Sequence, residues 1–246
     1  MAPTRDETLT GGTSGQTRAP RSLDRGREPW SRFAEIILRP QLKLWLNWDF
    51  EGLENLPKEG PVILACNHVS YFDPLALSYM TDTLGRRTRY LAKSELFKIP
   101  LVSTVLKGAG QIPVYRGTGS SAPLAAASEA LDAGLVVGIF PEGTTTKDPE
   151  FKVSTAKTGA ARLSLMTGVP ITPAAIWGSH RIWKTKLGFI PAFGRPVWIK
   201  VGAPIDMSDL GDADDPAVLR AATDRMMSAI STLRDDLAAH YPERWR

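Results

Sequence analysis

Short apolar runs separated by turn residues recur through most of this chain, and segments with helical periodicity lie between them. Each run has the length of one buried strand. Alternation of such runs with helices is typical of βα units, whose strands pair in parallel within one sheet. We therefore expect an α/β fold, a single domain with a largely parallel mixed sheet flanked by helices. The expected strands are PVILAC (61–66), RTRYLA (87–92), GQIPVY (110–115), LVVGIF (135–140), VPITPAAIW (169–177) and VWIKVG (197–202).

Helical patterns follow several of these runs. Segments 121–134 and 154–168 each end in a glycine, which suits the left-handed conformation after a helix. The last helix has the clearest start, because Asp214 or Asp215 can act as N-cap and Pro216 can take the first helical position. We expect that helix to end near residue 240.

The N-terminal region differs from the rest of the chain. Residues 1–29 are rich in Gly, Pro, Ser, Thr and charge, so we expect a disordered tail and no signal peptide there. Residues 30–50 mix three tryptophans and aliphatic residues with Arg, Lys and Glu, and contain a kinking Pro40. No apolar run there reaches the roughly 18 to 20 residues that cross a bilayer. This mixture favours an N-terminal amphipathic helix at a membrane interface, and the alternative is a helix packed on the protein's own core.

The charge balance is basic. A net charge of +4 indicates anionic partners, such as nucleic acid, phosphorylated metabolites or the anionic cytoplasmic leaflet, and does not choose among them. Residues 84–118 hold seven Lys or Arg and one acid, and residues 152–200 hold eight Lys or Arg and no acid. The alternative for most of these side chains is a solvated surface. Cys66 is the only cysteine, which excludes an intrachain disulfide and fits a reducing compartment.

The segment NHVSYFDP follows the first apolar run and places His68 five residues before Asp73. Residues five apart do not share a face in a regular strand or helix, so these two side chains can meet only across a turn. Pro74 makes a turn plausible, because it disfavours helical geometry at Asp73 and suits the start of a helix. Asp73 could cap that helix and also orient the imidazole, which leaves one ring nitrogen free as a general base. The alternative is a loop histidine beside an ordinary helix cap.

Three further segments follow other expected strands. They are Arg116 and Gly117, the sequence FPEGTT at 140–145, and Trp177 with Gly178. In open α/β sheets the ligand site lies beyond the carboxyl ends of the strands, so these groups are expected to converge on one cleft.

Together these segments resemble the glycerolipid acyltransferase family, the 1-acyl-glycerol-3-phosphate acyltransferases. NHVSYFDP is similar to the family's first motif, NHxSxxD; GQIPVYRG resembles the second, FPEGTT the third, FPEGTR, and VPITPAAI the fourth. Their order and spacing agree over about half the chain. The resemblance implies a glycerol-3-phosphate acyltransferase-like fold and an acyltransferase domain over residues 51–246.

The resemblance also implies roles for particular residues. His68 would take the proton from an acceptor hydroxyl that attacks an acyl thioester, and Asp73 would orient the imidazole. Arg116 and Glu142 would help to hold the glycerol-phosphate acceptor, with Gly143 allowing close approach of the backbone. We assign Glu142 to a hydroxyl or to the orientation of Arg116, because like charges repel phosphate. Thr144 of the third motif and Lys93 of the family-like segment AKSELFKIP complete the expected acceptor-binding residues.

The expected reaction makes phosphatidic acid from lysophosphatidic acid for phospholipid biosynthesis. Acyl-CoA or acyl carrier protein serves as co-substrate, with no bound cofactor and no covalent enzyme intermediate. One departure bears on the acceptor: Thr145 stands where the family usually has arginine, and Lys147 or Lys93 could supply the missing charge. Another lipid or glycerol 3-phosphate is the alternative acceptor. The expected partners are therefore a lysophospholipid, the acyl donor and an anionic membrane surface, with the protein peripheral or monotopic at the cytoplasmic face of the plasma membrane.

Other functions find less support in the residues. A hydrolase lacks a G-x-S-x-G nucleophile motif here, and Cys66 lies inside an apolar run, which favours a core position. Cys66, His68 and Asp73 lack the usual zinc spacing, so we expect no metal. The string GTTTK lacks the second glycine of a phosphate-binding P-loop. A non-catalytic lipid-binding scaffold is the main rival, whereas a nucleic-acid-binding module would explain the charge but not the motifs, so we expect no nucleic acid.

Overall fold

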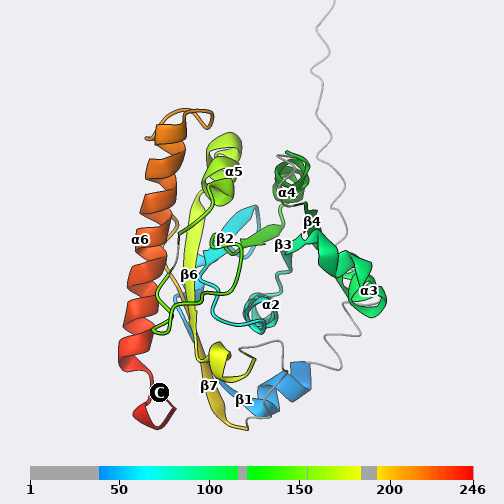
Figure 1. Ribbon diagram of the computed structural model, residues 1–246, viewed down its shortest axis with the longest axis vertical. Helices are drawn as coiled ribbons and strands as arrows, with labels where there is room; N and C mark the ends of the chain where they lie inside the picture. Colours follow the sequence, from blue (N-terminus) through cyan, green and yellow to red (C-terminus); the bar gives the residue numbers. More distant parts are fainter. Residues whose placement is uncertain (1–38, 116–120, 154, 184–192, 246) are drawn as a thin grey trace, which may run out of the picture.

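A seven-stranded sheet forms the centre of the protein in the computed structural model, which describes residues 39–115, 121–153, 155–183 and 193–245 (Figure 1). The strand order is β1-β7-β6-β2-β5-β3-β4. Neighbouring strands pair in parallel except β6 and β7, which are antiparallel. The predicted α/β fold with a largely parallel mixed sheet is confirmed. The strands are β1 Leu46–Glu51, β2 Val62–Cys66, β3 Thr88–Lys93, β4 Ile112–Val114, β5 Val136–Ile139, β6 Ile171–Trp177 and β7 Arg195–Val201.

Helices cover both faces of this sheet. Figure 1 shows α5 and α6 along one side and α2 on the other, while α3 stands away from the sheet and packs mainly on the 3-10 segment η2. The short 3-10 segments are η1 Leu53–Asn55, η2 Ser94–Lys98, η3 Ser179–Arg181 and η4 Glu243–Trp245. Besides the helical residues 39–45, the helices in the described part of the chain are α2 Asp73–Thr83, α3 Pro100–Gly108, α4 Ala122–Asp132, α5 Gly159–Thr167 and α6 Pro216–His240.

Strand β2 separates two hydrophobic cores. All five of its residues are buried, because it lies in the middle of the sheet with helices on both sides. Val62, Leu64 and Cys66 face the core shared with α2, whereas Ile63 and Ala65 face the core shared with α4, α5 and α6. A strand buried on both faces reads as a continuous apolar run, which is why VILAC shows no alternation.

The last helix begins as its sequence predicts. The Asp215 carboxylate accepts a hydrogen bond from the Ala217 main-chain N–H at 2.7 Å, and Pro216 takes the first helical position. The glycines expected after the two middle helices, Gly134 and Gly168, both have positive φ. The predicted start of the helix at residue 154 is wrong, because α5 begins at Gly159.

The predicted helix over residues 30–50 is wrong at its C-terminal end. Residues 39–45 are helical, but Leu46–Glu51 form β1, which pairs in parallel with β7. Inward and outward side chains alternate along β1, and this period of two marks a half-buried strand. The predicted domain boundary at residue 51 therefore cuts through the sheet. The tail 1–29 and residues 30–38 lie outside the described part of the chain.

Trp48 explains why this aromatic segment joins the core. Its indole packs on Phe72 and Tyr79 in the core shared with α2, at ring-centroid distances of 6.2 and 4.6 Å. Its Nε1–H donates a hydrogen bond to the Leu42 carbonyl at 2.8 Å. Among the described residues, no helix has the length and apolarity needed to span a membrane.

We expect Trp48→Ala to lower the free energy of unfolding by about 3 kcal/mol, because it removes an aromatic contact set and leaves a cavity beside α2. Urea denaturation followed by circular dichroism measures this loss. Leu44→Ala is the control, since Leu44 is 84% exposed and its truncation should change stability little. Equal stability of the two variants would contradict the placement of β1 in the core.

Candidate active site

The carboxyl ends of three neighbouring strands meet at one edge of the sheet. β2 lies between β6 and β5, and all three run in the same direction. The segments that follow them therefore leave the sheet side by side, as is usual for ligand sites in open α/β sheets. These segments are Asn67–Asp73 after β2, Phe140–Thr145 after β5 and Gly178–Trp183 after β6.

Asn67 lets the chain leave β2 without orphaned main-chain groups. Its side-chain amide donates to the Ile176 carbonyl at 3.2 Å and accepts from the Ile176 N–H at 2.8 Å. The amide thus pairs with β6 as a strand backbone would, and both buried groups of Ile176 remain satisfied. The main chain of the following residues is then free to turn.

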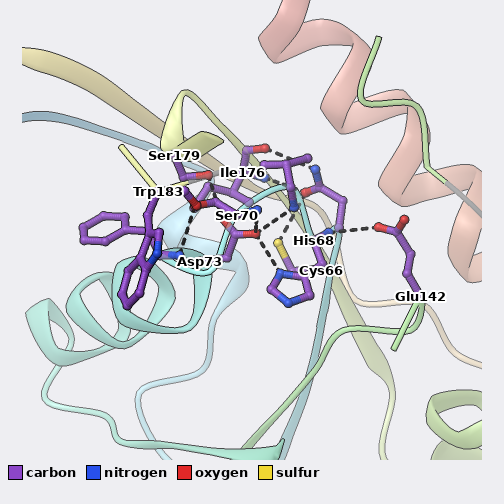
Figure 2. A network of polar contacts seen from close by, with 11 residues as sticks. Cys66, His68, Ser70, Asp73, Glu142, Ile176, Ser179 and Trp183 are labelled. Atoms are coloured by element: carbon purple, nitrogen blue, oxygen red, sulfur yellow. Dashed lines mark hydrogen bonds and ion pairs between the residues drawn. The ribbon is translucent and has the colours of Figure 1, made fainter. Parts of the chain in front are cut away.

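The turn brings His68 and Asp73 together. His68 Nδ1 and Asp73 Oδ2 are 2.9 Å apart, and the same oxygen accepts the main-chain N–H groups of Val69 at 2.7 Å and Ser70 at 2.8 Å (Figure 2). The other oxygen, Oδ1, accepts the Ser179 hydroxyl at 2.5 Å. The buried carboxylate therefore has four donors. With Nδ1 directed at Asp73, Nε2 is the imidazole nitrogen left for a substrate.

Asp73 does not cap the helix as the sequence predicted. Asp73 is the first residue of α2, and Phe72 occupies the N-cap position. No side-chain hydrogen bond caps the helix at Phe72. The carboxylate points back to the preceding turn because the Val69 and Ser70 N–H groups converge there. The predicted contact with the imidazole is present, and the predicted cap is wrong.

Glu142 holds the main chain of His68. Its Oε1 accepts the His68 N–H at 2.9 Å, and only 6% of the residue is exposed (Figure 2). The Phe140 ring stacks on the imidazole at a centroid distance of 4.3 Å. The segment after β5 thus fixes both the backbone and the ring of His68. The sequence had suggested a hydroxyl or Arg116 as the partner of Glu142, and Arg116 lies outside the described residues.

A cavity of about 1380 Å³ opens over His68. Its walls are largely apolar and come from α2, β3, α3 and the end of β5. Gly143, Thr144 and Thr145 contribute to the lining, and Lys93 lines the cavity from the end of β3. Other charged side chains in the lining include Arg39, Asp82, Arg86, Arg87 and Arg89. A large apolar cavity with a few convergent polar groups is the usual form of a ligand site.

The lysines suggested as replacements for the missing arginine lie in different places. Lys93 lines the cavity and has Glu95 at 3.8 Å, whereas Lys147 is exposed and does not contribute to the lining. Sequence reasoning missed Lys157, which also lines the cavity. Its side chain lies over Gly143, with Nζ 3.4 Å from the position that a Cβ there would occupy. The only signal for it was its place in the basic stretch 152–200.

Arg86 shows that part of the basic balance is structural. Its guanidinium donates to the main-chain carbonyls of Pro57, Gly60 and Gly134, and the residue is 8% exposed. It therefore ties its own loop, before β3, to the loops before β2 and β5 at the amino ends of the strands.

Cys66 is a core residue, as predicted. It is fully buried, and burial raises the pKa of its thiol well above the ordinary value, with a smaller contribution from the Asp73 and Glu142 charges. The thiol stays protonated at neutral pH, so Cys66 lacks the thiolate that a nucleophile needs.

The arrangement supports proton transfer at the floor of an apolar cavity. A buried carboxylate orients the imidazole and stabilises its charged form, so Nε2 can accept and return a proton. Nothing in this geometry requires a nucleophilic side chain.

Comparison with known proteins agrees with this geometry. A family model described as Acyltransferase matches residues 47–177. A 1-acyl-sn-glycerol-3-phosphate acyltransferase of Borreliella burgdorferi is 30% identical over 210 residues, which cover 82% of this chain and 81% of that protein. The protein of the same name from Bacillus subtilis is 27% identical over 190 residues, or 75% and 86% of the two chains. The crystal structure of the 1-acyl-sn-glycerophosphate acyltransferase PlsC from Thermotoga maritima is similar, with a TM-score of 0.63, 27% identity and coverage of 90% and 86%.

Proposed function

This chain belongs to the Acyltransferase family, and we propose that it transfers a fatty acyl group from an acyl thioester to the hydroxyl of lysophosphatidic acid, giving phosphatidic acid. The observation that carries the proposal is the His68–Asp73 pair at the floor of the large apolar cavity. Relatives named for this reaction match most of the chain, which supports the same acceptor here.

The reaction follows from the geometry of His68. Nε2 takes the proton of the acceptor hydroxyl as the hydroxyl oxygen bonds to the thioester carbonyl carbon. When the tetrahedral intermediate collapses, the carbon–sulfur bond breaks and the imidazolium returns the proton to the leaving thiolate. Asp73 stabilises the imidazolium between the two transfers. The step needs acyl-CoA or acyl carrier protein as co-substrate, and no resident cofactor.

Glu142 acts on the base rather than on the acceptor in this proposal. Its carboxylate lies at the His68 main chain and does not contribute to the cavity lining. We therefore assign it to holding the imidazole over the cavity. Gly143 and Thr144, which do line the cavity, are the residues of that segment proposed to contact the acceptor.

The acceptor phosphate requires a cation close to His68. The Lys157 side chain lies over Gly143. Gly143 directly follows Glu142, whose carboxylate binds the His68 main chain. We assign the phosphate to Lys157 together with Lys93, because both line the cavity on the side of the carboxyl ends of the strands, Lys157 over Gly143 and Lys93 as the last residue of β3. Thr145 stands where the family's third motif usually has arginine, so Lys157 supplies the missing charge in this proposal. The position of Arg116 relative to this phosphate stays a prediction.

The cavity mouth is proposed to face an anionic membrane. Exposed apolar side chains lie on and beside α3, with Ile99, Leu101 and Val105 exposed by 48, 77 and 51%, and all three also line the cavity. Exposed Lys98 and Lys107 flank them. Apolar residues with flanking lysines suit the boundary between acyl chains and anionic headgroups, so a lipid acceptor could pass directly into the cavity. Peripheral attachment at the cytoplasmic face of the plasma membrane follows as a proposal.

The first test is thiol release from palmitoyl-CoA by the purified protein with lysophosphatidic acid, glycerol 3-phosphate or a lysophospholipid as acceptor. We expect release with lysophosphatidic acid, and a loss of about 10²- to 10⁴-fold in His68→Ala, since that is the usual contribution of a general base. His240→Ala is the control, because His240 is an exposed residue at the end of α6. Release with a different acceptor alone would reassign the substrate, and equal rates for His68→Ala and wild type would contradict the mechanism.

A second test concerns the phosphate. Lys157→Met keeps the aliphatic stem over Gly143 and removes the charge, so the KM for lysophosphatidic acid should rise about tenfold or more. The KM for an acceptor without phosphate, such as monoacylglycerol, should not change. Lys152→Met is the matched control, because Lys152 pairs with Glu150 at 2.6 Å outside the cavity. A rise in the KM for acyl-CoA alone would place Lys157 at the donor instead.

Membrane contact is measured by sedimentation with phosphatidylglycerol vesicles. The double variant Leu101→Glu, Val105→Glu should lower the bound fraction severalfold, since both changes put negative charge on the exposed apolar surface of α3. Met166→Glu is the control, because Met166 is 55% exposed and lies on α5. Equal binding of the double variant and the control would show that another part of the chain makes the contact.

A further inference from the structure

The two oxygens of the Asp73 carboxylate are held by different parts of the chain (Figure 2). Within the described part of the chain, Oδ2 accepts from its own turn alone, namely from His68, Val69 and Ser70. Oδ1 accepts from the hydroxyl of Ser179, which lies 106 residues further along the chain. Asp73 and Ser179 are both fully buried. The orientation of the carboxylate is therefore shared between a local turn and a distant segment.

We propose that Ser179 is a positioning residue for the general base, and this inference rests on the proposed acyl transfer. A carboxylate can rotate about the bond to its Cβ, and rotation would move Oδ2 away from the imidazole. While Oδ1 is bound by Ser179, rotation breaks hydrogen bonds at both oxygens. Without that hydroxyl, Oδ1 is left as a buried acceptor with one donor fewer, which favours any rotation that recovers a partner.

Ser179 is itself placed by the backbone after β6. Gly178 has φ of +87°, and a Cβ there would lie 2.3 Å from the Pro196 carbonyl oxygen and 2.5 Å from the Tyr241 hydroxyl. Only glycine fits this position, and the turn that it allows directs the next side chain to Asp73. The 3-10 segment η3 then begins at Ser179, so its backbone is fixed as well.

The same segment grips the His68 turn at a second point. The Trp183 carbonyl accepts the Ser70 hydroxyl at 2.6 Å and the Tyr71 N–H at 3.2 Å. Residues 178–183 therefore hold the turn by its main chain and by the catalytic carboxylate. Ser179 does not contribute to the cavity lining, so it acts on the reaction through Asp73 and not through contact with substrate.

The test separates orientation from packing by steady-state kinetics with lysophosphatidic acid and palmitoyl-CoA. Ser179→Ala removes the hydroxyl, whereas Ser179→Cys fills the same space with a weak donor. We expect kcat to fall about tenfold to a hundredfold in both variants while both KM values stay within about twofold, because a charge-assisted hydrogen bond is lost away from the substrates. Ser179→Thr, which restores a hydroxyl, should recover kcat relative to the alanine variant.

Ser164→Ala is the matched control. Ser164 lies in α5 and is 2% exposed, and its hydroxyl donates to the Val169 carbonyl at 2.7 Å. The alanine variant therefore loses a comparable buried hydrogen bond. Its kcat should equal that of the wild type. Wild-type kcat in folded Ser179→Cys, or a fall in kcat matched by Ser164→Ala, would overturn the inference. If the wild type itself released no thiol with any acceptor, the proposed function would fail instead, so the two failures are distinguishable.

Discussion

The buried carboxylate of Asp73 is the interaction on which the site depends. An ionised carboxylate excluded from water is tolerated only where donors replace its hydration, and here four donors do so. Two of them are main-chain N–H groups, which forces the backbone of Val69 and Ser70 to curl around the side chain. That curl carries His68 from the end of β2 to a position beside Asp73. The same contacts that satisfy the charge thus orient the base.

The sheet order makes this arrangement possible. β2 is the middle strand, so the segments after β5 and β6 flank the His68 turn on either side. Glu142 from one side binds the His68 main chain, and Ser179 from the other binds Asp73. Parallel strands bring all three segments to one edge, whereas an antiparallel neighbour would carry one of them to the opposite edge. The antiparallel β7 lies beyond β6 and does not disturb this edge.

Patterns within the sequence predicted six of the seven strands, because buried apolar runs are local signals. The missed strand, β1, shows where local signals fail. Its aromatic residues between charged ones suit an interfacial helix as well as a half-buried strand, and only the pairing of β1 with β7 distinguishes them. Helix α3 was also missed, since its apolar pattern is short. The prediction that Asp73 caps α2 was wrong for a related reason. The direction of a carboxylate depends on the donors around it, and tertiary structure places those donors.

By itself, the sequence determined the α/β class, every strand except β1, the core position of Cys66 and the motif segments that identify the family. These features follow from the types and spacing of residues that lie close together in the sequence. The tertiary structure alone decided that Glu142 serves His68, that Ser179 serves Asp73 and that Lys157 lies at Gly143. Each of these contacts joins segments that are distant in the chain. Their geometry depends on strand order and loop direction, and no local pattern of residues encodes either one.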